Sequence, residues 1–419
     1  MQRLTILFVI LPLLIQGQQT NTSYQKRVLE QGELDVLFSY YSQDGQNAAV
    51  SGGEGTEELT DATSTIVLRM PWGQDGILTV DAGVSAYTSA SSSNVDPFDG
   101  GGTANPFDAS SGASRKDLLA YFNPGYSHSS KDRNEIVGVN AYVSAEYDYF
   151  SIGFGGSYAR LFNEKNTELS VSAQAYFDSW NAQYPIELRN GFNTGVVGYD
   201  PDFTRFADLG RNSYSLGFVF SQILTKRMQA SLSLDLVVQN GLLSTPFQRV
   251  YFGDVADFFL EDFQLADDVE RLPDSRFKIP LGGRLNYYLN DAVVLRSFYR
   301  FYYDDWGIVS HTLNMELPLK LSDSFTLYPS YRYYTQTAAD YFYEKEAALS
   351  SFEFYTSDFD LSNYSANQFG FGLQYRDIFT RTKLLLFGLK AIDLRYAYYR
   401  RSNGLDASII TLGTSFVID

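Results

Sequence analysis

Charged side chains set within alternating apolar runs are the residues of this sequence best placed to do chemistry. The set lies in the carboxy-terminal half and comprises Arg284, Arg296, Arg300, Glu316, Lys320, Arg332, Arg376, Asp393 and Arg395. Each occupies the polar parity of its own run, so all of them are expected to face one interior. Charges of both signs there could line a water-filled passage or could pair to brace the interior. We favour ion pairing, because a wide polar interior needs satisfied charges whether or not a solute passes through it.

A second group of candidate residues is acidic. Asp96, Asp99 and Asp108 lie in a segment rich in Ser, Gly and Asp, and three carboxylates could bind a hard cation such as Ca²⁺. Their spacing matches no EF-hand loop, so we expect a solvated acidic loop and no metal site. The chain has no cysteine, which excludes disulfides and thiolate ligands. The sequence therefore predicts neither a resident metal nor a cofactor.

Nucleophilic catalysis is also disfavoured. The sequence contains two histidines, His128 and His311. A serine hydrolase needs a base within reach of its nucleophile, and His311 lies on the apolar parity of its run. We expect no enzyme.

The elements that must position the charged residues are strands. Between residues 309 and 321 the odd positions from 313 onward are all apolar, whereas positions 312, 314 and 316 are polar. A period of two is the pattern of a strand with one apolar and one polar face. The neighbouring runs follow after turns of only a few residues, at 304–307 and 322–324, which requires antiparallel pairing.

Similar runs recur along the chain, and the lengths of their connections alternate. We count about sixteen strands, within a range of 14 to 18. The connections after strands one, three, seven, nine and thirteen are long, and those after strands two, four, six, eight, ten and twelve are tight. This asymmetry is typical of an up-and-down transmembrane β-barrel of the outer membrane, with long extracellular loops, short periplasmic turns and both termini in the periplasm. A soluble sandwich has no reason to sort its loops, and a closed barrel leaves no free sheet edge in the bilayer.

Composition and the amino terminus agree with this reading. Arg3 followed by the apolar run 4–15 predicts a signal peptide over residues 1–17, leaving 18–419 as a single barrel domain in contact with outer-membrane lipid. The net charge of -17 argues against a nucleic-acid partner. Aromatic residues make up 16% of the chain, which suits strands and interfacial girdles.

Several short motifs resemble a family of Gram-negative outer-membrane proteins known as domain-of-unknown-function family 3570. The motifs are SGAS at 111–114, EYDY at 146–149, LSTPFQRV at 243–250, RLPD at 271–274, DDWG at 304–307 and YPSYRYY at 328–334. The resemblance implies a barrel encoded near a small lipoprotein and a flavin-attaching transferase, and hence a lipoprotein or envelope redox partner. It supplies no catalytic residue.

Two functions stay open at this point. One is a channel or conduit across the outer membrane, and the other is a plugged barrel that acts as a scaffold or receptor through acidic extracellular loops. We favour the conduit, because interior charges of both signs suit a wet passage better than a dry core.

Overall fold

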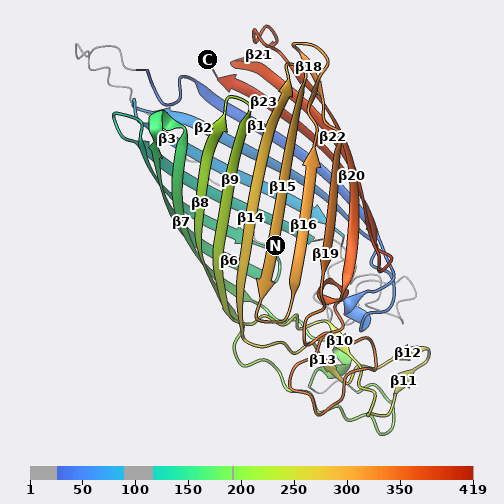
Figure 1. The fold of residues 1–419 in the computed structure, drawn as a ribbon. Helices are drawn as coiled ribbons and strands as arrows, with labels where there is room; N and C mark the ends of the chain where they lie inside the picture. The colour runs from blue at the N-terminus through green and yellow to red at the C-terminus, as the bar shows by residue number, and fades with distance from the viewer. Residues whose placement is uncertain (1–25, 89–116, 191–192, 419) are drawn as a thin grey trace.

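Sixteen antiparallel strands close into a barrel in the computed structural model, which describes residues 26–88, 117–190 and 193–418 (Figure 1). The signal peptide expected at residues 1–17 lies outside the described residues, as do Asp96, Asp99 and Asp108. Within the described residues, no helix is long and apolar enough to span a membrane.

Each barrel strand pairs with its neighbours in the chain, and the first strand pairs with the last. The strands that run unbroken are β1 (Gly32–Asp44), β2 (Leu59–Trp72), β3 (Gly76–Tyr87), β4 (Asp117–Ser129), β5 (Glu135–Ala145), β6 (Tyr149–Phe162), β7 (Thr167–Trp180), β8 (Gly210–Thr225), β9 (Met228–Gly241), β14 (Ser275–Asn290), β15 (Val293–Asp304), β20 (Tyr364–Arg376), β22 (Phe387–Arg401) and β23 (Asp406–Ile418). The pairing of β1 with β23 extends from Gly32 with Ile418 to Asp44 with Asp406, which closes the sheet on itself. The closed architecture and the strand number predicted from the sequence are confirmed.

Two barrel strands are interrupted, which corrects the continuous runs expected at 309–321 and directly after the turn at 322–324. One strand consists of β16 (Val309–Glu316) and β17 (Leu319–Lys320), and its neighbour consists of β18 (Phe325–Leu327) and β19 (Ser330–Gln336). The breaks contain Pro318 and Pro329. Proline has no N–H to donate to the ladder, so pairing lapses at these positions although the apolar alternation continues across them.

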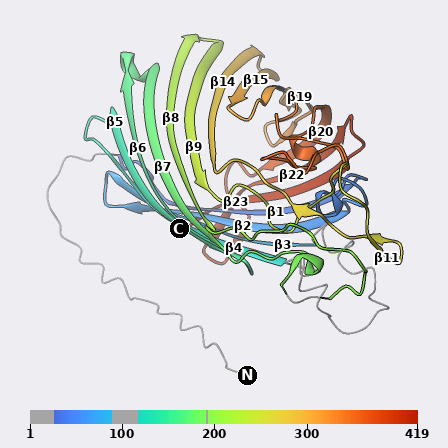
Figure 2. The same ribbon diagram turned by 90° about the horizontal axis from the view of Figure 1, so that it is seen from below.

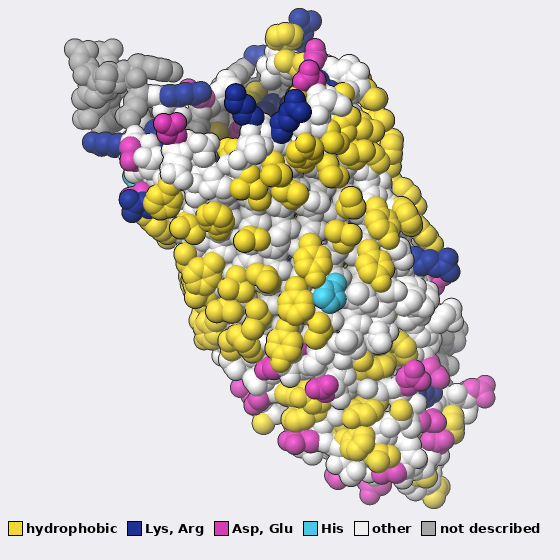
Figure 3. Space-filling view, viewed as in Figure 1, with side chains coloured by type: hydrophobic (Ala, Val, Ile, Leu, Met, Phe, Trp, Pro, Cys, Tyr) yellow, Lys and Arg dark blue, Asp and Glu magenta, His cyan; other side chains and the backbone are white. Residues whose placement is uncertain are grey.

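The register fixes which side chains share a face. Phe298 pairs with Asn314, and Asn314 pairs with Arg332, so the polar parity of β15, β16 and β19 faces the interior. The opposite parity is exposed on the outside, as in Val139, Phe154 and Leu232, whose relative exposures are 57%, 55% and 58%. On the face shown in Figure 3, hydrophobic side chains cover the middle of the wall, most of the acidic side chains lie toward one end, and most Lys and Arg side chains lie toward the other. An apolar exterior of this kind suits the hydrocarbon of a bilayer.

The long connections all leave the same end of the barrel, here called the loop end. They span residues 45–58, 88–116, 181–209, 242–274 and 337–363, and the second of these is mostly outside the described residues. The opposite end, here called the turn end, holds short connections and the beginning and end of the barrel domain. The loops gather toward the side formed by β1, β20 and β22 (Figure 2). The predicted sorting of the connections is therefore present in the fold.

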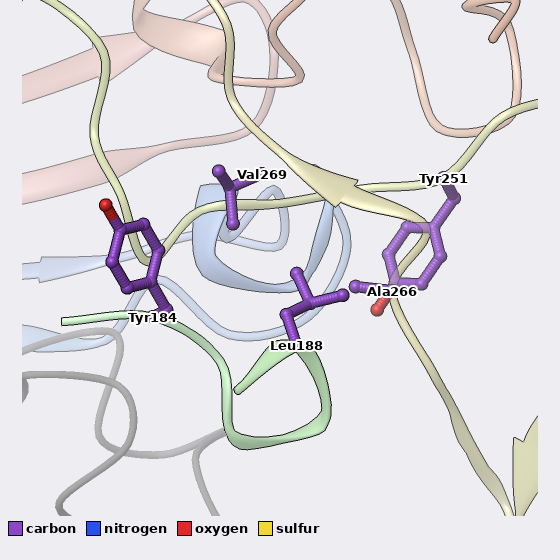
Figure 4. Packing of buried hydrophobic residues seen from close by; sticks show 5 residues of the cluster. All are labelled: Tyr184, Leu188, Tyr251, Ala266 and Val269. Carbon is purple, nitrogen blue, oxygen red and sulfur yellow. The ribbon is translucent and has the colours of Figure 1, made fainter. Parts of the chain in front are cut away.

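The described loops pack on one another and form what we call the loop cap, built from residues 45–58, 181–209, 242–274 and 337–363. One hydrophobic cluster joins Tyr184 and Leu188 to Tyr251, Ala266 and Val269 (Figure 4). A second cluster consists of Val250, Phe252, Ala348 and Tyr355. Four short strands add two small sheets: β10 (Arg249–Val250), β11 (Phe259–Leu260), β12 (Phe263–Gln264) and β13 (Asp268–Val269). The cap thus has a core of its own outside the membrane-spanning wall.

The outward parity makes a prediction about assembly. We expect Leu232→Arg to destabilise the barrel by about 2 to 4 kcal/mol, because it places a charge against lipid, whereas Ser233→Arg should cost far less because its side chain faces the interior. Urea unfolding in lipid vesicles, followed by tryptophan fluorescence, measures both variants. Equal losses at the two neighbouring positions would contradict the assignment of faces.

Candidate functional site: the barrel lumen

Glu316 is the centre of an ion network on one wall of the lumen. It accepts hydrogen bonds from Arg296 Nη1 and from Arg395 Nη1, each at 2.8 Å. Arg395 Nε also donates to Asp393 Oδ1 at 2.7 Å. Because Arg296 lies on β15 and Arg395 on β22, the carboxylate connects strands that are not direct neighbours.

Gly372 and Tyr328 allow the two arginines to approach Glu316. A Cβ at Gly372 on β20 would lie 3.1 Å from Arg395 Cγ and 3.2 Å from Tyr328 Cβ, so a larger residue there would crowd the network. The Tyr328 ring lies beneath two guanidinium groups, with its centroid 4.8 Å from Arg395 Cζ and 6.0 Å from Arg296 Cζ. Stacking of this kind holds arginine side chains against the wall through cation–π attraction.

Three further arginines of the wall make no ion pair with any described residue: Arg284, Arg300 and Arg332. Arg284 lies with Cζ 5.6 Å from the centre of the Phe298 ring. The Nε atoms of Arg300 and Arg332 are buried and have no hydrogen-bond partner in the described part of the chain. We call Arg284, Arg296, Arg300, Arg332 and Arg395 together the arginine wall.

The other two charges in the predicted set lie apart from this wall. Lys320 Nζ pairs with Asp323 Oδ1 at 2.7 Å, in the turn that follows β17. Arg376 is the last residue of β20 and is exposed. Both therefore lie at the turn end, away from the network around Glu316.

Sequence reasoning overlooked a second ion cluster on the lumen face. Arg69 Nη1 donates to Asp35 Oδ2 at 2.7 Å, and Lys390 Nζ donates to Glu33 Oε1 at 2.7 Å. Glu33 and Asp35 alternate with apolar residues in β1, so the same parity rule could have identified them.

The side of the lumen next to the arginine wall is lined by small hydroxyl residues and tyrosines, and the two sides meet where Ser231 of β9 pairs with Arg284 of β14. We call the lumen-facing serines of β7, β8 and β9 the serine wall: Ser170, Ser172, Ser213, Ser215, Ser221, Ser231 and Ser233. All seven are partly exposed. Beside them the ring of Tyr142 lies 6.1 Å from that of Tyr121 and 5.6 Å from that of Tyr176. Since β5 and β19 lie eight strands apart in a barrel of sixteen, Tyr142 and Arg332 occupy opposite walls.

The loop 337–363 covers the arginine side of the lumen at the loop end. Ser310 and Ala366 lie on the lumen-facing sides of their strands, and their relative exposures are only 2% and 1%. Gln336 Nε2 donates to the carbonyl oxygens of Asp360 and Ser362, which fastens the loop to the end of β19. The lumen is thus lined asymmetrically, with one wall covered near this end and the serine wall partly exposed.

A buried ion pair holds the loop cap together. Arg249 Nε lies 2.6 Å from Glu187 Oε1, and both side chains are 1% exposed. Arg249 Nη1 also donates to the carbonyl of Val50 at 3.2 Å, so one guanidinium links three loops. Removing one partner of a fully buried pair leaves an uncompensated charge, which costs about 3 to 5 kcal/mol.

His311 lies on the outward face, where its Nδ1 is 2.7 Å from the Tyr299 hydroxyl. The sequence analysis placed His311 on the apolar side of its strand, and this position agrees with that. The ring is therefore kept away from the lumen residues.

Comparison with known proteins decides the family. Residues 102–413 match the family described as "Protein of unknown function (DUF3570)". The chain belongs to this family. The family resemblance inferred from the motifs is therefore confirmed. No curated protein matches the sequence.

Solved structures of similar fold are outer-membrane barrels. A bacterial polysaccharide outer membrane secretin aligns with 10% identity and a TM-score of 0.45, covering 93% of this chain and 99% of that one. A BenF-like porin from Pseudomonas fluorescens gives 8% identity and a TM-score of 0.42 over 93% and 100% of the two chains. OccK1 of Pseudomonas aeruginosa aligns with 8% identity and a TM-score of 0.40, covering 93% of this chain and 99% of that one. The DUF3570 chain is a closed antiparallel β-barrel of sixteen strands.

A buried carboxyl makes the loop cap sensitive to pH. Glu270 is 2% exposed, and burial, reinforced by nearby Asp358, raises its pKa from 4.5 to about 8. The folded cap therefore keeps a proton that an open cap would release above pH 4.5. The stability of the cap is expected to fall as pH rises toward 8, by at most about 1.4 kcal/mol per pH unit, and to level off above it.

Hydrogen exchange of residues 242–274 and 337–363 between pH 6.5 and 8.5 tests this, after correction for the intrinsic pH dependence of exchange. The wild-type cap should lose protection across that window, and Glu270→Gln should show a flatter profile. Glu353→Gln, at an exposed position in the loop 337–363, serves as the control. A slope unchanged by Glu270→Gln would contradict the assignment.

Proposed function

We propose that this barrel is a conduit that lets polar solutes cross the outer membrane. The observation that carries the proposal is the partial exposure of the serine wall, from Ser170 on β7 to Ser233 on β9. Hydroxyl groups facing a lumen that admits water need no protein partner, whereas the same groups in a dry core would have to be satisfied internally. A barrel of sixteen strands is also wide enough to leave an aqueous interior.

Charge on the arginine wall supports the same conclusion. Arg284, Arg300 and Arg332 have no carboxylate partner among the described residues, and burying unpaired guanidinium groups in an apolar filling would be costly. A hydrated lumen removes most of that cost. The loop cap then acts as a constriction at the mouth on the side of the arginine wall.

Single-channel conductance in a planar bilayer tests the conduit. The purified wild-type barrel should give steady conductance. Arg249→Gln should raise the conductance or its fluctuations, because it leaves Glu187 buried without its partner and loosens the loops at the mouth. The exposed Arg227→Gln, in the turn between β8 and β9 at the turn end, should leave the current unchanged. A silent wild-type barrel and a silent Arg249→Gln variant would contradict the conduit.

The second candidate function is a scaffold or receptor, and the buried core of the loop cap favours it. A cap with its own hydrophobic clusters presents a preformed surface, on which Asp254, Asp257, Glu261 and Asp262 are exposed. The family resemblance adds a small lipoprotein or an envelope redox protein as the proposed partner. A silent barrel that co-purifies with such a protein would favour this second function over the first.

A further inference from the structure

Positive charge exceeds negative charge on the arginine wall. The arginine wall holds five guanidinium groups, and the carboxylates that pair with them are Glu316 and Asp393. Three positive charges are therefore left without a counter-charge on this wall. On the serine wall, β9 carries the carboxylate of Asp235 on the lumen parity. A positive strip thus runs along one side of the passage.

Two of the uncompensated arginines flank a single strand. Arg300 pairs in the register with Thr312, and Arg332 pairs with Asn314, so the two arginines lie on either side of β16. Their Nε atoms are buried without an acceptor among the described residues. An unsatisfied buried donor is unfavourable, more so when it is charged, and an anion bound between the two side chains would offset that cost. The Asn314 side chain between them offers an amide donor as well.

Two hollows in the wall border β16, the strand between this pair, and Asn314 and Glu316 line both. One, of about 220 Å³, is lined by Arg284 and Arg296. The other, of about 280 Å³, is lined by Arg332, Arg395 and Gln368, among others. A small anion that moves along the wall would therefore meet guanidinium groups in succession. Planar guanidinium groups recognise carboxylate and phosphate through paired hydrogen bonds.

We propose that the arginine wall binds small carboxylate or phosphate anions and makes the barrel select anions over cations, with Arg300 and Arg332 as the principal pair. This inference rests on the proposed conduit and adds the class of solute. The acidic exterior of the loop cap does not oppose it, because surface charges farther away than the Debye length of about 8 Å are largely screened at physiological salt.

The reversal potential in a KCl gradient tests the inference. The wild-type barrel should be more permeable to chloride than to potassium, and the triple variant Arg284→Gln, Arg300→Gln and Arg332→Gln should lower that permeability ratio severalfold. The matched control removes three positive charges outside the lumen, through Arg160→Gln, Lys226→Gln and Arg227→Gln at the turn end, and should leave the ratio nearly unchanged. Heat-modifiable migration on a gel confirms that each variant is folded. The single variant Arg332→Gln should lower the permeability ratio by less than the triple variant does.

Inorganic phosphate and succinate, added separately, distinguish phosphate binding from carboxylate binding. The anion that the wall binds should reduce the current reversibly in the wild type and should not do so in the triple variant. A conducting wild type that prefers potassium, or a ratio unchanged by the triple variant, would overturn the anion inference and leave the conduit standing. A wild type with no conductance would overturn the conduit and the inference together.

Discussion

The obligation to satisfy every backbone hydrogen bond inside a bilayer is the constraint on which this structure depends. Lipid offers no donor or acceptor, so a sheet in the membrane must have no free edge. The pairing of β1 with β23 meets that requirement along the full length of both strands. Once the sheet is closed, strand alternation places one parity against lipid and the other in the lumen, and the chemistry of the lumen follows from the second parity.

The lumen is polar in two different ways. On the serine wall, small hydroxyl groups need only water. On the arginine wall, Glu316 ties Arg296 to Arg395 and stabilises strands that do not pair directly. Ion pairing and passage are therefore not exclusive alternatives, since part of the charged set braces the wall and the rest faces the open space. The loop 337–363 adds a lid over the arginine side and is fastened there through Gln336.

Much of this could be predicted from the sequence, because parity and turn length are local signals. They give the barrel, the strand number, the sorting of the loops and the facing of Arg296, Glu316 and Arg395. The breaks at Pro318 and Pro329 were missed, since the alternation of apolar residues hides a local loss of pairing. The loop cap was missed for a different reason. Nothing in the acidic segment 242–274 marks a buried carboxyl, yet Asp268 and Glu270 are buried there and accept hydrogen bonds from Tyr355 and Thr356.

Contacts of that kind join residues far apart in the chain, so no local pattern reports them. Glu187 and Arg249 are separated by 62 positions, and nothing in either neighbourhood marks them as partners. The choice of partner for Glu316 was equally hidden. Parity places a carboxylate and several arginines in one lumen, but only the register and the absence of a side chain at Gly372 decide which of them meet.

The central claim is that water fills the lumen beside the serine wall, and the reactivity of single cysteines tests it most directly. The natural chain has no cysteine, so Ser215→Cys, Ser310→Cys and Leu216→Cys each provide one reporter. A water-soluble methanethiosulfonate reagent applied to the barrel in lipid vesicles should modify Ser215→Cys rapidly, and should modify Ser310→Cys, under the loop, and Leu216→Cys, against lipid, far more slowly. Protection of Ser215→Cys to the same degree as Leu216→Cys would show a dry interior and contradict the account.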